Sequence, residues 1–277
     1  MKEGILMMKF LKKSGEKNKK IHDIILKKYE EYKQHLDNKF ISALEQDESF
    51  YQSIFELYFI DFLSDTSSYK YIMTHEDYGP DFRFMHPEGS FAIECVAPKN
   101  AENQHYKIPD IEKGQGCIVQ RVEHDKLELR LANSFKNKQA QYQRWISKEV
   151  ISPSLPLILA IGLNALPPAQ VIVENTPEKI AKLLFSRDGS DIFYKDQDPK
   201  KGVATNFGKE YTMFSGFFIC TEIIPSLAAW KKDISKLYFV PNPYAANKLP
   251  EAILKDFENE FNLLKTTEYM LECCVVD

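Results

Sequence analysis

The chain has 277 residues, of which 44% are hydrophobic, 13% aromatic and 27% charged, and its formal net charge is −4. This composition supplies enough apolar surface for a large packed domain, and the acidic balance argues against a protein that coats nucleic acid over its whole surface. A local basic groove remains compatible with it. No stretch reaches the roughly 18 apolar residues of a membrane-spanning helix, so no membrane partner is expected.

The cysteines, the histidines and the first residues of the chain indicate a cytoplasmic protein without a zinc site. The five cysteines stand at positions 95, 117, 220, 273 and 274, none of them in Cys-X-X-Cys spacing, which is typical of reduced thiols. The six histidines show no spacing of zinc ligands. The first ten residues lack the apolar core and the cleavage site of a signal peptide.

Residues 1–48 are predicted to form a basic, helical segment ahead of a single α/β domain over residues 49–277. Lysines dominate residues 1–20, which favours a solvated lead, with a basic arm that contacts phosphate as the alternative. Across residues 21–44 the apolar residues recur mainly at three- and four-residue steps, and this spacing predicts an amphipathic helix.

Residues 49–63 are predicted to form a second helix that is buried on most sides. Ser49 is a plausible N-cap, and the following run is apolar nearly all round, as expected of a helix inside a core. Glu56 lies in the middle of this run. Because a buried carboxylate needs a partner, Glu56 is expected to contact either a metal site or a cation such as Arg83.

After a short strand predicted within residues 69–73, residues 78–96 alternate in the pattern of a β-hairpin around a loop at 86–89. The register that aligns the apolar positions pairs Met85 with Ser90, Phe84 with Phe91, Phe82 with Ile93, and Asp81 with Glu94. Two carboxylates directly opposite one another destabilise a sheet. The arrangement therefore predicts a bound divalent cation or a proton shared between Asp81 and Glu94.

A long helix is predicted over residues 119–147, and Lys138 is the unusual member of its apolar stripe. Lys138 follows Phe135 by three residues and precedes Tyr142 by four, so the three side chains project to the same side of the helix, toward the sheet. The lysine is interpreted as a site residue. The alternative is that its stem is buried while its ammonium reaches water.

The remaining pattern completes an α/β protein with a central mixed β-sheet flanked by helices on both faces. Buried strands are predicted at residues 155–163, 213–222 and 236–240, with a short strand at 170–173. Helices are predicted at residues 176–185 and 250–271, and loops at 100–118 and 187–210.

Pro80-Asp81, followed one hairpin later by Glu94, resembles the motif of the PD-(D/E)XK nuclease superfamily, which has the restriction-endonuclease-like fold. The resemblance implies a Mg²⁺ or Mn²⁺ ion held by Asp81, Glu94 and the backbone carbonyl of Cys95, with Glu56 contributed by the preceding helix. Val96 stands where the family usually has its lysine. In some members this lysine has moved to the following helix, and the resemblance assigns that role to Lys138.

The function implied by the resemblance is metal-dependent phosphodiester hydrolysis of a nucleic acid, DNA or RNA, with Asp81, Glu94 and Lys138 as catalytic residues. The alternative is a catalytically inactive relative that binds nucleic acid or a protein partner, which the absence of Glu-X-Lys and the acidic net charge favour. A third alternative is an unrelated α/β protein in which Asp81 and Glu94 are hairpin residues only. A metal between Asp81 and Glu94 would favour the enzyme, and a Glu94 engaged in a salt bridge would favour the binding protein.

Overall fold

The computed structural model describes residues 16–44, 46, 49–64, 72–73, 79–102, 107, 124–163, 166, 212–220 and 237–263. Several predicted segments lie outside these residues, namely 1–15 of the lysine-rich lead, most of the loop at 100–118, the strand at 170–173, the helix at 176–185 and the loop at 187–210. Within the described ranges, every helix is too short or too polar to cross a lipid bilayer.

The described strands form one mixed sheet in which the strand order follows the chain, from β1 to β7. The strands are β1 (Ile72–Met73), β2 (Phe82–His86), β3 (Gly89–Val96), β4 (Leu157–Gly162), β5 (Phe214–Cys220), β6 (Leu237–Pro241) and β7 (Asn262–Leu263). β3, β4 and β5 run parallel to one another, β6 and β7 are also parallel, and the other neighbouring pairs are antiparallel. The prediction of an α/β protein with a mixed sheet is confirmed.

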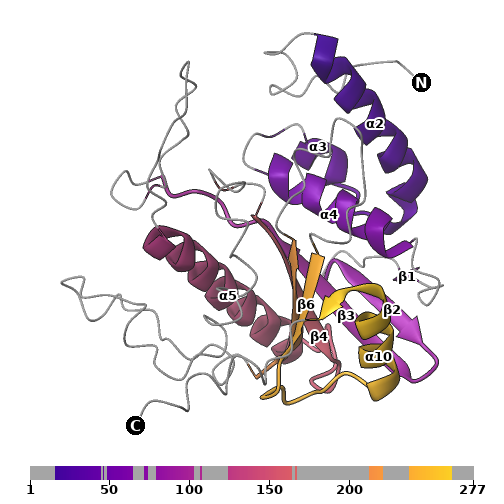
Figure 1. Ribbon diagram of the computed structural model, residues 1–277, viewed down its shortest axis with the longest axis vertical. Helices are drawn as coiled ribbons and strands as arrows, with labels where there is room; N and C mark the ends of the chain where they lie inside the picture. The colour runs from indigo at the N-terminus through magenta and orange to yellow at the C-terminus, as the bar shows by residue number, and fades with distance from the viewer. Residues whose placement is uncertain are drawn as a thin grey trace.

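Helices cover both faces of this sheet (Figure 1). α5 (His124–Ser147) packs on the face that carries Ala92 and Val96 of β3. α4 (Phe50–Ser64) and α10 (Glu251–Glu260) pack on the opposite face, against Phe91 and Ile93. Successive residues of a strand point to opposite faces, so the apolar residues of β3 divide between two apolar clusters, one on each face.

The strands of the hairpin pair in the predicted register, but the predicted pair of Asp81 with Glu94 lies just outside the ladder, because β2 begins at Phe82. Phe82 pairs with Ile93, Phe84 with Phe91 and Met85 with Ser90. The turn is tighter than the predicted loop, because His86 and Gly89 form the last pair and only two residues lie between them. The stacked rings of Phe84 and Phe91, with centroids 5.0 Å apart, lie on the core face and fix this register.

The helix predicted over residues 21–44 is interrupted. The structure instead has α2 (Glu16–Tyr32), a short 3₁₀ helix η1 (Lys33–His35) and α3 (Phe40–Leu44). The Asp37 carboxylate accepts a hydrogen bond from the backbone N–H of Lys39 at 2.8 Å, and the Asp37 carbonyl accepts one from Phe40 at 2.9 Å. Aspartate side chains compete for backbone donors in this way, which begins a new helix at α3.

Two other helix ends differ from the prediction. α10 ends at Glu260, well short of residue 271, because residues 262–263 pair with β6 as strand β7. Phe261, at the transition, packs its ring 5.0 Å from that of Phe218 in the core. Ser49 precedes α4, but its hydroxyl donates to the carbonyl of Ala43 at 2.6 Å and does not cap the helix as predicted.

Candidate active site

Asp81 and Glu94 lie next to each other at the start of β2. The backbone N–H of Asp81 donates to Glu94 Oε2 at 3.2 Å, and Asp81 Oδ2 accepts from the backbone N–H of Cys95 at 2.7 Å. β2 begins at Phe82. Just before it, the side chain of Asp81 accepts the hydrogen bond of the β3 backbone at Cys95 that a further residue of a paired strand would otherwise accept. Glu94 is 2% exposed, which puts its carboxylate inside the protein.

Lys138 reaches this pair from α5. Its Nζ forms an ion pair and hydrogen bond with Glu94 Oε1. Phe135 and Tyr142, on either side of it along the helix, are fully buried against the sheet. The ammonium therefore contacts Glu94, and only 19% of the Lys138 side chain is exposed. The alternative, in which the ammonium extends into water, does not describe this lysine.

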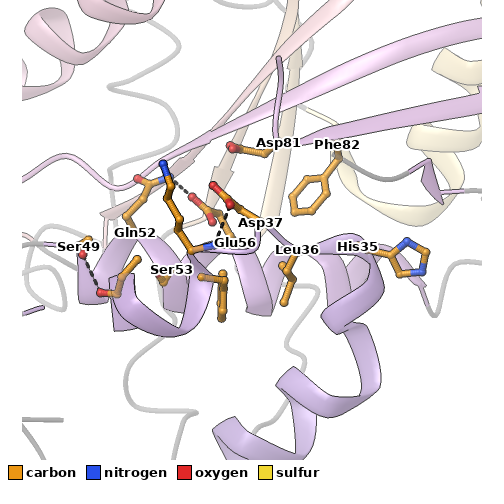
Figure 2. A pocket seen from close by; sticks show the side chains of 12 residues that line it. His35, Leu36, Asp37, Ser49, Gln52, Ser53, Glu56, Asp81 and Phe82 are labelled. Carbon is orange, nitrogen blue, oxygen red and sulfur yellow. Dashed lines mark hydrogen bonds between the residues drawn. The ribbon is translucent and has the colours of Figure 1, made fainter. Parts of the chain in front are cut away.

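Glu56 enters the site from α4, on the other side of β3. Glu56 and Asp81 line the same cavity of about 160 Å³, together with Asp37, and Figure 2 shows these three carboxylates directed into a common space. The Arg83 guanidinium donates instead to the carbonyl of Val150 at 3.0 Å. The alternative in which Glu56 pairs with Arg83 is therefore not formed.

Gln52 is a residue of the site that the sequence reasoning missed. Its Nε2 donates to Glu56 Oε1 at 2.8 Å and to the carbonyl of Cys95 at 2.9 Å, and its Oε1 accepts from the N–H of Ala97 at 2.7 Å. The side-chain amide thus bonds one carbonyl and one N–H of the backbone at the end of β3, as the backbone of a neighbouring strand would. A signal was available, because Gln52 and Glu56 are polar residues one helical turn apart in an apolar run.

Asp37 was also missed. Its sequence position indicates no role, since it falls inside what the pattern predicts to be an uninterrupted helix. The break between η1 and α3 brings it to the rim of the Glu56 and Asp81 cavity, where its charge contributes to raising the pKa of both carboxyl groups.

The carboxylates of the site lie close together, Glu94 buried and Glu56 and Asp81 half-buried, and this dominates their protonation. Burial raises the pKa of Glu56 to about 7, with the charge of Glu94 adding to the effect and the Gln52 hydrogen bond opposing it. Burial also raises the pKa of Asp81 to about 7, with Glu56 adding to it. For Glu94, burial and Asp81 raise the pKa, while the Lys138 ammonium opposes the rise.

Lys138 is the cation that partly compensates this negative charge. Burial alone would lower the pKa of its ammonium, but the charges of Glu94 and Asp81 outweigh burial and raise it. Lys138 is therefore charged at neutral pH. One ammonium faces the three carboxyl groups of Glu56, Asp81 and Glu94, so the cluster is short of positive charge when all of them are ionised.

The donor set suits a hard divalent cation. Carboxylate and carbonyl oxygens are the ligands that Mg²⁺ takes, and Mg²⁺ is commonly held by only one or two carboxylates, with water and substrate phosphate completing its shell. Among the described residues no group of three or more His, Cys, Asp and Glu side chains is arranged as a metal site. A smaller set of ligands fits the ion, namely the two carboxylates of Asp81 and Glu94 and the carbonyl of Cys95. This carbonyl accepts a hydrogen bond from Gln52 and keeps a second lone pair for a metal.

A second opening lies on the α5 side of the site. It is a cleft of about 710 Å³ between α5 and residues 97–102, and its lining includes Gln52 and Lys138, which contact the carboxylate cluster. Its described lining includes three cations, Lys99, Arg130 and Lys138, and one carboxylate, Glu102. The two openings thus meet the cluster from opposite sides, one lined by carboxylates and the other mainly by cations and amides.

The chain was compared with protein-family models, with curated proteins and with solved structures, and no match was found in any of the three comparisons.

Proposed function

We propose that the chain hydrolyses phosphodiester bonds of a nucleic acid at a PD-(D/E)XK-like site, and that its sheet is a restriction-endonuclease-like core. The observation that carries this proposal is the meeting of Lys138 with Glu94 beside Asp81. Lys138, on the helix after the hairpin, contacts the second acidic residue of the motif, and in this proposal it does the work of the lysine that Val96 replaces.

Each residue has a distinct role in the proposed reaction. Asp81, Glu94 and the Cys95 carbonyl would hold Mg²⁺ or Mn²⁺, and Glu56 adds a further carboxylate at the same cavity. When bound, such an ion polarises a phosphate and lowers the pKa of water. Lys138 carries a fixed positive charge, which orients the attacking water or stabilises the negative charge that develops on the phosphate.

Gln52 and the burial of the cluster keep these groups in place. Gln52 fixes the orientation of the Cys95 carbonyl and of Glu56 through hydrogen bonds of 2.9 and 2.8 Å. The low exposure of Glu94 strengthens its interaction with charge in the site, because charges interact more strongly away from water.

The proposal is tested by a cleavage assay on plasmid DNA, single-stranded DNA and RNA with Mg²⁺ or Mn²⁺. Wild type is expected to cut at least one of these substrates, and EDTA is expected to stop the reaction. Asp81→Asn and Glu94→Gln should lose cleavage while keeping the circular dichroism spectrum of the wild type. Glu88→Gln, in the exposed turn of the same hairpin, is the matched control and should cut normally.

One observation favours a second candidate function. Both oxygens of Glu94 are engaged, one by Lys138 and the other by the backbone of Asp81, and the ion pair can hold α5 to the sheet without any metal. In that case the chain binds nucleic acid or a protein partner and cuts nothing. Wild-type protein that leaves all three substrates intact with both metals would support this second function over hydrolysis.

A further inference from the structure

We propose that the cleft between α5 and residues 97–102 binds the sugar-phosphate backbone of a single-stranded nucleic acid. This inference rests on the proposed function for what happens where the strand would meet Lys138. The binding itself depends on residues that lie outside the carboxylate cluster.

The polar lining of the cleft comes mainly from one stripe of α5. Arg130, Asn133, Asn137, Lys138 and Gln141 follow one another at one-, three- and four-residue steps and all line the cleft, because residues at three- and four-residue spacing share one face of a helix. Lys99, which is exposed, faces them from the loop after β3. These side chains are all hydrogen-bond donors, and phosphate oxygens are acceptors.

Among the residues that line the cleft, Arg130 gives the strongest indication of an anionic ligand. Its Nε is buried, and among the described residues no hydrogen-bond partner contacts this atom. Burial lowers the pKa of the guanidinium, but an arginine remains charged in proteins. A buried donor without a partner costs free energy, and a phosphate in the cleft would satisfy it, since guanidinium groups bind phosphate in bidentate geometry.

The size and shape of the cleft favour a single strand over a duplex. Its volume of about 710 Å³ is in the range of roughly 300–1,000 Å³ typical of sites that enclose small ligands. Proteins read a duplex by placing a protruding helix or ribbon in its groove, whereas this cleft is a recess whose lining includes Lys138, the partner of the buried Glu94. A flexible strand can insert one phosphate into such a recess.

The lining also predicts how the strand is held. Among the described lining residues none is aromatic, so base stacking, which usually supplies much of the affinity for single strands, has little part here. Binding should therefore depend on phosphate contacts, show little sequence preference and weaken steeply with salt.

The test is the affinity of the full chain for a fluorescein-labelled 12-nucleotide single strand of mixed sequence, measured by fluorescence anisotropy in EDTA. The variants are Lys99→Gln, Arg130→Gln and both together. Lys136→Gln is the matched control, because Lys136 is an exposed cation on the same helix outside the cleft. Titrations from 50 to 200 mM salt give the salt dependence, and a duplex of the same length is the competing ligand.

The double variant is expected to bind at least about 10-fold more weakly, and the magnitude of its salt slope should fall by about 1.4, at about 0.7 per lost phosphate contact on a single strand. The control should bind as the wild type does. An RNA 12-mer that behaves like the DNA supports the inference, since the two share the phosphate backbone. Unchanged affinity in both single variants, or tighter binding of the duplex, overturns it.

Failure of this inference is distinguishable from failure of the proposed function. Because EDTA removes divalent metals, a wild type that binds the strand but never cuts it overturns hydrolysis alone. A wild type that cuts, with unchanged KM and affinity in the double variant, overturns the cleft alone. Lys99 is exposed, so Lys99→Gln remains informative even if Arg130→Gln lowers the melting temperature.

Discussion

The two openings on either side of Gln52 differ in charge. Toward α3 and α4, the cavity presents the carboxylates of Asp37, Glu56 and Asp81, with the exposed Lys39 at its edge. Toward α5, the cleft presents cations and amides. β3 lies between the two helical layers and contributes Glu94, which faces α5. In the proposed site, the acidic half therefore consists of these carboxylates together with Glu94, and the basic half consists of the cations and amides that line the cleft beside α5.

The largest effect is expected at the contact between the two halves. Lys138→Met removes the ammonium while keeping most of the side-chain volume, and charge stabilisation by one such group is commonly worth on the order of 10²–10³ in rate. We expect cleavage with Mn²⁺ to fall by about that factor in single-turnover assays. Lys136→Met, two residues away and exposed, should keep the wild-type rate. Equal rates in the wild type and Lys138→Met would refute the role of Lys138.

The acidic half is tested by metal binding without any substrate. A ligand at 100 times its dissociation constant stabilises a protein by about 2.7 kcal/mol, so saturating Mg²⁺ should raise the melting temperature of the wild type in differential scanning fluorimetry. Asp81→Asn should remove this rise, and Glu88→Gln should keep it. A wild type whose melting temperature is the same in Mg²⁺ and EDTA would contradict a metal site at Asp81 and Glu94.

The boundary between the halves is tested at Gln52. Gln52→Leu introduces an apolar side chain of similar size and leaves the carbonyl of Cys95 and the N–H of Ala97 without their amide partner. Unsatisfied buried groups cost about 1–3 kcal/mol each, and partial access of water reduces this to about 2 kcal/mol in total. Urea unfolding should show this loss, while Gln143→Leu on the exposed face of α5 should not. Equal stability of the two variants would mean that Gln52 does not support the edge of β3.

Much of the sheet and the motif could be predicted from the sequence because both depend on local pattern. Alternation fixed the hairpin register, and helical spacing aimed Lys138 at the sheet that bears Glu94. The helical spacing of Gln52 and Glu56 could point to a polar pair, but the contact of Gln52 with β3 could not be assigned in this way, because those partners are backbone groups more than 40 residues away in sequence. Backbone groups look alike in any sequence, so only the tertiary structure identifies which side chain satisfies them.

The same reason explains the errors at helix ends. The apolar spacing of residues 21–44 continues through the break at Asp37, where a side-chain hydrogen bond to Lys39 decides the outcome. Beyond Glu260 the sequence pattern is still helical, but residues 262–263 form a strand because they pair with β6, and Phe261 packs in the core. Both outcomes depend on competition between local propensity and a distant partner, and periodicity measures only the first.

The smallest expected effect concerns the protonation of the acidic half. Glu56 has a pKa of about 7 in the folded protein, above its ordinary value of 4.5, so the folded state holds this proton more tightly than the unfolded chain does. The contribution of Glu56 to the stability of the metal-free protein is therefore fully present below about pH 4.5. This contribution is lost as the pH rises toward 7. Asp81, whose pKa is also raised to about 7, acts in the same direction.

Glu56→Gln should remove part of this pH dependence. Between about pH 5 and pH 8, the free energy of unfolding in EDTA should fall in both proteins. We expect the fall to be smaller in the variant by about 1 kcal/mol, a value that is discounted for the partial exposure of Glu56. Urea titrations at the two pH values give this difference, and Glu88→Gln should behave as the wild type. If Glu56→Gln and the wild type lose the same stability over this range, Glu56 is not confined with the other carboxylates, and the acidic half reduces to Asp37, Asp81 and Glu94.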